Sequence, residues 1–561
     1  MFINRGRLEN LVNQKTTKIN LNELKSEINF FDNLIVYKKN DKVRVYDRKC
    51  DHAGGKLISK GSDTFCPMHM WKFNPLSGQY DNGIKKKELE YSIKENHLEI
   101  KDSFYEPKIL STSKKLKTEI RFFNHAFLKI SGEDFSFCTD PWAIGPAFNT
   151  GWWLKKLTKI DWLENLNNSD FIYISHNHPD HLHPLTLSKV DNKIPIIVPN
   201  FISNSTGKYI EELGFKNIIK LDFNIQYNLK ETNLFISLLK SGDFREDSGM
   251  YFSNGEFTGL LNVDANMLNF DRLPSVDFYA SSFAGGASGY PLMFENYQNN
   301  EKNKITIKNK NFLKRKNFDN ILKTSPKYFM PYAGFFEEKL SRDRNINKSN
   351  KKNTIEDYSN FCEKNKIKLI NVLKKDHVEF FGNKLIFEKT VIKNEVIDLQ
   401  PEKYLEYYKR EFSKIDENYI KKYFENCGFK DNLQLYILLT DDNFKLLNKN
   451  YFIDFTKNKI CFDTLSKFDD SILKNKSNIK KLVLKIRKES FLNTIYNKLP
   501  WEDLSIGFQC KILRNPNLYN KDFWHHFTNI YITSKNVRQI TNCGSCQELN
   551  QFLDSQLNQR I

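Results

Sequence analysis

The sequence predicts a multidomain chain with a small all-β domain over residues 1–105, an α/β domain over 119–395 and an α+β domain over 396–561. Short alternating runs such as KVRVYD (42–47), separated by Gly, Pro and Asn, predict the first domain. In the second, apolar runs such as DFIYIS (170–175) alternate with helical stretches, which is typical of a sheet covered by helices. The third is richer in helical periodicity, as in PEKYLEYYKREF (401–412).

The charge balance limits the classes of partner. Lys and Arg outnumber Asp and Glu by 86 to 68, which gives a formal net charge of +18 at pH 7. Such an excess attracts anionic ligands and acidic proteins, although Lys-rich tracts such as 300–320 are also typical of solvated faces. No helix-turn-helix, zinc-finger or RNP pattern accompanies the charge, so we expect no nucleic-acid partner.

The chain also lacks the signals of a membrane or secreted protein. No apolar run approaches about 18 residues, and the N-terminal segment lacks a secretory-signal pattern. The nine cysteines are an odd number spread over a long chain, which argues against a disulfide framework. We therefore expect a cytoplasmic protein without membrane insertion, whose cysteines are free for metal chemistry.

Two short motifs in the first domain each combine a cysteine with a histidine. Cys50-x-His52 is followed by Cys66-x-x-His69. Two Cys and two His can hold a structural zinc ion. One Cys and one His from each loop are also the ligands of a Rieske 2Fe-2S cluster, in which two imidazoles hold one iron. The glycines and proline of these loops resemble those of a Rieske domain, so we favour the iron–sulfur interpretation, with all four residues as ligands.

A second candidate metal site lies in the α/β domain. The segment ISHNHPDHLHP (174–184) carries His176, His178, Asp180 and His181 just after the predicted strand DFIYIS. The carboxyl ends of such strands are where α/β sheets place their sites. Four of the chain's eleven histidines fall within eight positions here, so scattered surface histidines are an unsatisfactory explanation.

This segment resembles the metal-binding loop of the metallo-β-lactamase superfamily, which implies an αββα sandwich. In that superfamily His176 and His178 would hold one metal ion. Asp180 and His181 would hold a second ion, and Asp264, after the run LLNV, would bridge the two.

One departure from the superfamily pattern changes the expected metal. No histidine occurs between His183 and His377, so the imidazole that usually precedes the bridging aspartate is missing. Asp243, with Asp247 four residues on, stands at about that place, and we take Asp243 as the candidate ligand. Carboxylates in place of imidazole favour iron or manganese over zinc, so we expect non-haem iron, mononuclear or dinuclear.

Several longer segments carry a more specific resemblance. They are DPWAIGPAFNTGWWL (140–154), DFIYISHNHPDHL (170–182), SFAGGASGYP (282–291), PYAGFF (331–336) and WEDLSIGFQCKILRNPNLY (501–519). With them the whole chain resembles the CMP-N-acetylneuraminate hydroxylase family. The resemblance implies a Rieske-type non-haem iron monooxygenase that hydroxylates the N-acetyl methyl of CMP-N-acetylneuraminate with O₂. The Rieske cluster would relay the electrons.

The resemblance leaves the partners and the substrate open. The family implies an acidic electron donor such as cytochrome b5, with an NAD(P)H-dependent reductase, and a ferredoxin or flavodoxin could replace it. A related branch is expected to hydroxylate UDP-N-acetylmuramate. A metal-dependent hydrolase with an accessory Rieske domain is the main alternative. The glycine-rich GGASG (285–289) could bind an anion through backbone N–H groups or form a tight turn beneath the site.

Overall fold

The structure is a computed structural model. It describes residues 1–7, 12–31, 34–48, 50, 57–60, 63–65, 72–81, 85–105, 116–201, 204–241, 246–268, 270, 273–390, 396–457, 459–469, 471 and 478–528. No helix within these ranges is both long and apolar enough to cross a bilayer.

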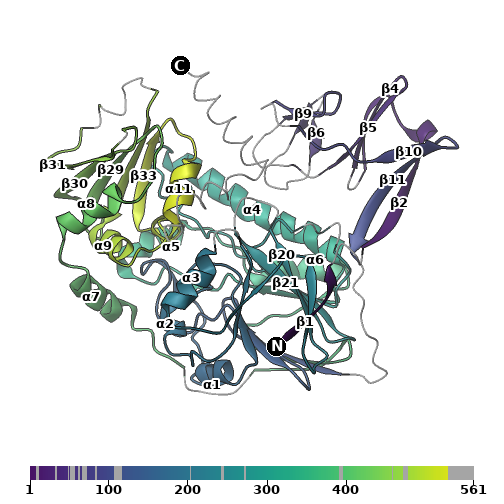
Figure 1. The fold of residues 1–561 in the computed structure, drawn as a ribbon, viewed down its shortest axis with the longest axis horizontal. Coiled ribbons are helices and arrows are strands. Elements are labelled where there is room, and N and C mark those ends of the chain that lie inside the picture. The colour runs from purple at the N-terminus through teal and green to yellow at the C-terminus, as the bar shows by residue number, and fades with distance from the viewer. Residues whose placement is uncertain are drawn as a thin grey trace.

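Two eight-stranded sheets form the centre of the molecule (Figure 1). The first contains, in spatial order, β1 (Phe2–Arg7), β19 (Ile225–Leu229), β20 (Phe235–Lys240), β21 (Ser248–Ser253), β22 (Thr258–Leu261), β23 (Phe278–Ser282), β24 (Tyr328–Tyr332) and β26 (Lys368–Leu369). The second contains β18 (Ile218–Leu221), β17 (Ile196–Pro199), β16 (Phe171–Tyr173), β14 (Ser136–Thr139), β13 (Phe127–Ser131), β12 (Lys117–Asn124), β27 (His377–Phe381) and β28 (Lys384–Lys389). The expected strand 170–175 is β16, which pairs in parallel with β17.

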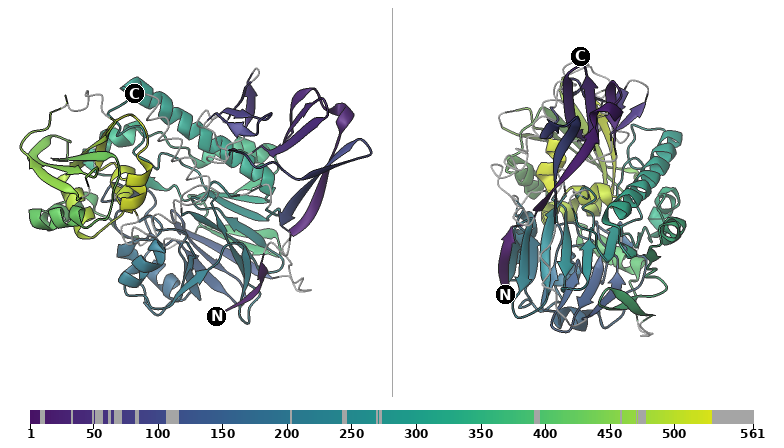
Figure 2. Two further views of the ribbon diagram at one scale, coloured as in Figure 1. Left: turned by 45° about the horizontal axis from the view of Figure 1, so that its top comes forward. Right: turned by 90° about the vertical axis from the view of Figure 1, so that its right-hand side faces the viewer.

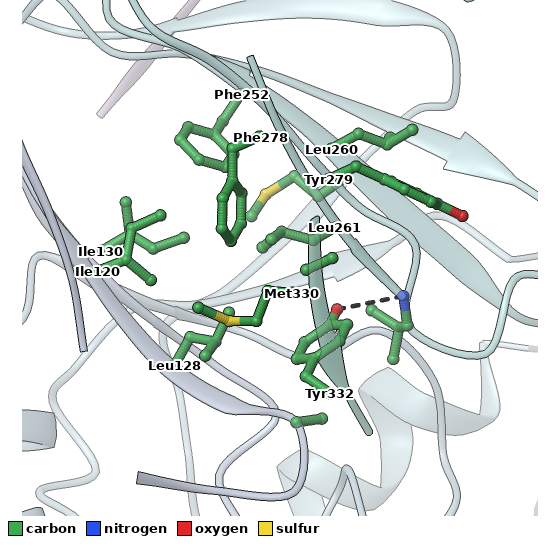
Figure 3. Packing of buried hydrophobic residues seen from close by; sticks show 14 of the residues in the cluster. Ile120, Leu128, Ile130, Phe252, Leu260, Leu261, Phe278, Tyr279, Met330 and Tyr332 are labelled. Carbon is green, nitrogen blue, oxygen red and sulfur yellow. Dashed lines mark hydrogen bonds between the residues drawn. The ribbon is translucent and has the colours of Figure 1, made fainter. Parts of the chain in front are cut away.

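The main hydrophobic core lies between these two sheets. Ile120 and Ile130 from one sheet face Phe278 and Met330 from the other (Figure 3). The buried Tyr332 also lies here, and its hydroxyl accepts a hydrogen bond of 3.1 Å from the backbone N–H of Val263. Because Val263 directly precedes Asp264, the core fixes the backbone next to a candidate metal ligand.

Helices cover the outer faces of both sheets, so the centre is the expected αββα sandwich. On one side lie α1 (Trp162–Asn167), α2 (Pro184–Leu187) and α3 (Ser205–Glu212), whose apolar residues form a separate core with β16 and β17. On the other side lie α4 (Asn299–Thr324) and α6 (Ser359–Lys364), which contact β23 and β26. The helix α3 ends just before Gly214, whose φ of +94° is left-handed.

Three small sheets build the N-terminal part, which projects from the sandwich in Figure 2. They contain β10 (Tyr91–Lys94), β11 (His97–Tyr105) and β2 (Val12–Asn20); β3 (Glu27–Phe30), β4 (Leu34–Lys39) and β5 (Lys42–Asp47); and β6 (Ile58–Lys60), β7 (Asp63–Phe65), β8 (Lys72–Asn74) and β9 (Gln79–Tyr80). Cys50 lies just after β5 and is buried against Tyr46 and Leu57. His52, Cys66 and His69 lie outside the described residues.

The first strand of the chain departs from the predicted boundary of the all-β domain. Within residues 1–105, β1 leaves the small sheets and pairs antiparallel with β19 of the sandwich. Phe2 packs edge-on against Phe171 there, with 5.7 Å between ring centroids. Burial of an apolar side chain and protection of a sheet edge explain this placement.

The C-terminal part has a five-stranded sheet with helices packed on it. The strands, in spatial order, are β31 (Cys461–Leu465), β30 (Leu446–Asp454), β29 (Leu433–Thr440), β32 (Lys480–Arg487) and β33 (Cys510–Asn515). The helices are α7 (Pro401–Glu411), α8 (Glu417–Glu425), α9 (Lys488–Tyr496), α10 (Glu502–Ile506) and α11 (Lys521–Thr528). Trp152 and Trp153 of the central part belong to the same apolar core as this sheet, so the C-terminal part packs tightly on the sandwich.

Candidate metal centre

The histidine-rich loop is anchored at the end of β16 by Asp140. The Asp140 carboxylate accepts hydrogen bonds of 2.7 Å from both the backbone N–H and the hydroxyl of Ser175. Asp140 is itself fully buried at the end of β14, the strand that pairs with β16. The loop therefore leaves the sheet in a fixed direction, with its histidines turned toward the carboxyl ends of the strands.

His176, His178 and Asp247 form the first group of candidate ligands. His176 Nε2 lies 2.8 Å from His178 Nδ1 and 4.0 Å from Asp247 Oδ1. One ligand atom from each of the three residues lies within 4.8 Å of the other two, as expected for groups that converge on one ion. Ser175 Oγ lies 2.9 Å from His176 Nδ1, which leaves His176 Nε2 directed into the site.

A second group lies beside the first. His181 Nε2 is 3.3 Å from Asp180 Oδ2 and 3.6 Å from Asp264 Oδ2. His125, at the end of β12, points its Nε2 at Asp180 Oδ2 over 3.1 Å. His176, His181 and Asp264 also fall within one 4.8 Å group, so Asp264 lies where it can contact both sets.

Carboxylates outside the site orient two of these imidazoles. Asp140 Oδ2 lies 3.0 Å from His181 Nδ1, which leaves His181 Nε2 for the site. On the opposite side, Glu502 Oε2 lies 3.8 Å from His178 Nε2, so the Nδ1 of His178 is the atom that faces His176. Such carboxylate–histidine pairs hold metal ligands in place and raise their basicity. Glu502 belongs to α10, so the C-terminal part contributes directly to the site.

Two buried polar atoms without hydrogen-bond partners in the described part of the chain indicate whether a metal ion fits this site. His181 Nε2 and Asp180 Oδ1 are buried and have no hydrogen-bond partner among the described residues. Buried polar atoms are nearly always paired. A cation between these groups would satisfy both, and nitrogen and carboxylate donors suit first-row transition metals. The donor set therefore fits a metal ion.

The carboxylates of the site also determine how strongly its histidines hold protons. Burial opposes a charged imidazole, but Glu502, Asp247 and Asp180 outweigh it and raise the pKa of His178 to about 9. Burial likewise acts against charge on His181, yet Asp180 and Asp140 raise its pKa well above the usual range. The pKa of Asp180 lies well below its usual range because His181 and His125 outweigh its burial. This site attracts positive charge, whether from protons or from a metal ion.

The fourth histidine of the cluster has a structural role. His183 caps α2, where its Nδ1 accepts a hydrogen bond of 3.2 Å from the backbone N–H of Thr186. Its Nε2 lies 3.1 Å from the carbonyl oxygen of Pro146. Burial lowers the pKa of His183 to about 4, so this ring is neutral and fully engaged.

The structure brings together most of the residues predicted for this site. His176, His178, Asp180, His181 and Asp264 lie in neighbouring groups of candidate ligands. Asp243 lies outside the described residues, and Asp247, immediately before β21, is the carboxylate that faces His176.

Sequence reasoning did not select His125, Asp140 or Glu502 as site residues. The first two each lie directly after a strand, β12 and β14 respectively, and such strand ends are a usable signal. Glu502 has none, because it is more than three hundred positions from His178 in the sequence.

Comparison with known proteins identifies the chain's relatives. Residues 9–92 match the family described as Rieske [2Fe-2S] domain, which confirms the predicted iron–sulfur domain. The chain is 31% identical over 539 residues to a cytidine monophosphate-N-acetylneuraminic acid hydroxylase from Xenopus laevis, and the match covers 88% of each chain. The chain belongs to the cytidine monophosphate-N-acetylneuraminic acid hydroxylase family. A further hydroxylase of this family, from Macaca mulatta, is 29% identical over 572 residues, covering 93% of this chain and 94% of the relative.

Solved structures resemble the chain over a shorter span. CmlA, a diiron beta-hydroxylase from Streptomyces venezuelae, is 16% identical with a TM-score of 0.26, covering 40% of this chain and 45% of CmlA. An isothiocyanate hydrolase from Delia radicum gut bacteria is 12% identical with a TM-score of 0.30, covering 48% of this chain and 99% of the hydrolase. The membership in the hydroxylase family rests on the sequence relatives.

Proposed function

We propose that this member of the hydroxylase family is a monooxygenase that converts the N-acetyl methyl of CMP-N-acetylneuraminate to an N-glycolyl group. The observation that carries the proposal is the place of Asp247 beside His176 and His178 in a chain that also has a Rieske domain. A carboxylate at that position makes the site richer in oxygen donors and favours iron over zinc. A hydrolytic zinc site would have no use for the electrons that a Rieske cluster transfers.

The residues divide into two metal sites. In the proposed assignment, His176, His178 and Asp247 hold one iron of the central domain. Asp180, His181 and Asp264 would hold a second iron. Cys50, His52, Cys66 and His69 hold the Rieske cluster. When bound, iron supplies O₂ activation and the cluster supplies single electrons.

The chain's own residues position the substrate and limit the access of water. The side chains of His178 and Asp264 are 18% and 30% exposed, whereas those of His176, Asp180 and His181 are almost completely buried. Substrate therefore reaches the site along the edge formed by His178, Asp264 and Glu502. A methyl group beside an amide is inert to acid–base catalysis, so the protein has to orient this methyl and keep bulk water away.

The proposed electron donor is an acidic protein such as cytochrome b5, a ferredoxin or a flavodoxin, reduced by an NAD(P)H-dependent reductase. The charge of +18 supports an acidic partner, because opposite charges accelerate the encounter of two proteins.

The deciding experiment gives the iron-reconstituted protein a donor system and O₂ with CMP-N-acetylneuraminate, in parallel with UDP-N-acetylmuramate. Mass spectrometry should find a product heavier by one oxygen, formed only with reductant. A product from UDP-N-acetylmuramate alone would move the proposal to that sugar. Cleavage of either compound without reductant would replace the proposal with a hydrolase.

A further inference from the structure

Arg514 is a buried cation for which the described part of the chain offers no carboxylate partner. It lies near the end of β33 and is only 8% exposed. Its guanidinium lies 4.9 Å from the ring centre of Phe294, and its Nε donates a hydrogen bond of 2.9 Å to the side-chain oxygen of Asn517. No carboxylate of the described part of the chain lies within ion-pair distance of it. A buried charge without a counter-charge is costly, so an anionic ligand would stabilise this arrangement.

Three tyrosines surround this arginine. The hydroxyls of Tyr297, Tyr290 and Tyr519 are all close enough to Arg514 to act on its charge. The rings of Tyr290 and Tyr297 meet edge to face with 5.7 Å between centroids. Tyr290 is 36% exposed and Tyr519 is 43% exposed, so two aromatic side chains are accessible beside the cation. Large exposed aromatic surfaces next to a cation are typical of sites that bind a planar base and an anion.

The arginine and its tyrosines lie next to the metal centre. The hydroxyl of Tyr519 donates a hydrogen bond of 3.2 Å to Glu502 Oε1, and the other oxygen of Glu502 faces His178 over 3.8 Å. Tyr519 and Glu502 therefore connect the surroundings of Arg514 with a candidate iron ligand.

The glycine-rich segment 285–289 does not supply an alternative anion site here. Gly285 and Gly286 have φ values of +69° and +71°, and the Asn350 amide donates to the carbonyl oxygen of Gly286. A Cβ at Gly289 would lie 2.3 Å from the carbonyl oxygen of Ser505 in α10. Close packing therefore explains two of these glycines, Gly286 against Asn350 and Gly289 against α10.

We propose that Arg514, together with Tyr290, Tyr297 and Tyr519, forms the subsite that binds the phosphate and base of the nucleotide. The planar guanidinium matches the oxygens of a phosphate, and the exposed tyrosine rings offer faces for a pyrimidine. A nucleotide held there places the attached sugar over Glu502 and its N-acetyl group toward His178. This assignment rests on the proposed function, since it names the substrate-binding part of the same site.

The test measures binding of CMP to the holoprotein by calorimetry and compares Arg514→Gln with Arg410→Gln. Arg410 is the matched control because its guanidinium also lies over a tyrosine ring, that of Tyr407, on α7. Loss of charge-assisted hydrogen bonds corresponds to about 10–100-fold weaker binding, so we expect this loss for Arg514→Gln and none for Arg410→Gln. With CMP-N-acetylneuraminate, KM should rise by a similar factor while kcat changes little.

Tyr290→Ala tests the base contact independently of the charge of Arg514, and thermal unfolding checks that the variant keeps its fold. We expect about 10-fold weaker CMP binding, in line with the contribution of one stacked base. Unchanged CMP affinity in both Arg514→Gln and Tyr290→Ala, with normal thermal unfolding and cluster absorption, would overturn the subsite. If Arg514→Gln does not fold, the Tyr290→Ala result alone decides.

Free N-acetylneuraminate, which has a carboxylate but no phosphate, distinguishes the source of the anion. Arg514→Gln should leave its binding unchanged, and a selective loss of this binding would contradict the phosphate assignment. If the wild-type protein forms hydroxylated product and Arg514→Gln keeps the same KM, the subsite fails while the proposed function stands. If the wild-type protein neither binds CMP nor forms product, the proposed function fails.

Discussion

At the scale of single residues, Asp247 is the side chain on which the proposed choice of metal depends. It is buried, and it lies 4.0 Å from His176. A carboxylate brings negative charge to a site that already contains Asp180 and Asp264. Such a donor set favours metal ions that accept oxygen ligands.

Asp247→Ala should deplete the central domain of the ion held with His176 and His178. Removing a residue that only hydrogen-bonds to a metal ligand already lowers metal affinity by about 10–100-fold, and removing a ligand itself lowers it further. Iron analysis, corrected for the two irons of the cluster by its absorption, measures the effect. Asp243→Ala is the comparison, and it should retain the metal; the opposite pattern would assign the ligand to Asp243.

The sequence could predict the metal loop but could not choose between Asp243 and Asp247. His176, His178, Asp180 and His181 lie within six positions, so their spacing alone brings them together. For the later carboxylate, the choice depends on where β21 begins, and the structure starts this strand at Ser248. Strand ends are poorly determined by sequence, and a shift of a few residues changes which side chain faces the site.

Metal binding should compete with protons at His178. Its raised pKa, about 9, means that the ring is protonated at neutral pH in the metal-free protein. A metal ion needs the deprotonated ring, so binding has to release this proton. The affinity for ferrous iron should therefore increase by about tenfold per pH unit for each proton released, and level off near the pKa of His178. Anaerobic titrations against a competing chelator between about pH 6.5 and 8.5 measure this slope, and a flat profile would contradict it.

At the scale of elements, α10 joins the C-terminal part to the metal centre. The backbone contact there is close, since a Cβ at Gly507, just after α10, would lie 2.2 Å from the carbonyl oxygen of Phe148. A Cβ at Gly151 would lie 2.0 Å from the carbonyl oxygen of Gly507 itself. These glycines let the two parts approach closely enough for Glu502 to reach His178. The sequence segment WEDLSIGF marked this region by resemblance only, because no local spacing relates it to the histidine loop.

Glu502→Gln should weaken metal binding without unfolding the protein. The amide keeps an oxygen that can accept the hydrogen bond of Tyr519, but it removes the negative charge that supports His178. We expect about 10-fold lower affinity for the ion held by His178, which is at the lower end of the loss seen when a residue that orients a metal ligand is replaced. Glu425→Gln on α8, where Glu425 pairs with Lys421, provides the control for a lost surface carboxylate. Equal affinities in both variants would show that α10 does not act on the metal centre.

At the scale of the whole molecule, the domains are interwoven rather than arranged as separate units along the chain. The strand β1 begins the chain but completes a sheet of the central sandwich, and the small sheets follow it. Local patterns predicted the strands of the first domain. They could not predict that the six-residue strand β1 pairs with a strand more than two hundred positions away, because only tertiary packing fixes that pairing. The fold class could be predicted because it depends on repeated local patterns, whereas the place of β1 in the central sandwich depends on a single long-range pairing.

The net charge leads to a prediction about electron delivery. With a charge of +18, the protein should attract an acidic donor. Salt shortens the range of this attraction, because the screening length falls from about 10 Å at 0.1 M to about 3 Å at 1 M. The rate at which a ferredoxin or cytochrome b5 reduces the Rieske cluster should therefore fall at least about tenfold over this range. Stopped-flow absorption of the cluster measures this rate. A small neutral reductant is the control and should reduce the cluster equally fast at both salt concentrations, since it has no charge to screen. A protein donor with the same rate at both concentrations would mean that shape and apolar contacts, rather than the positive charge, guide the encounter.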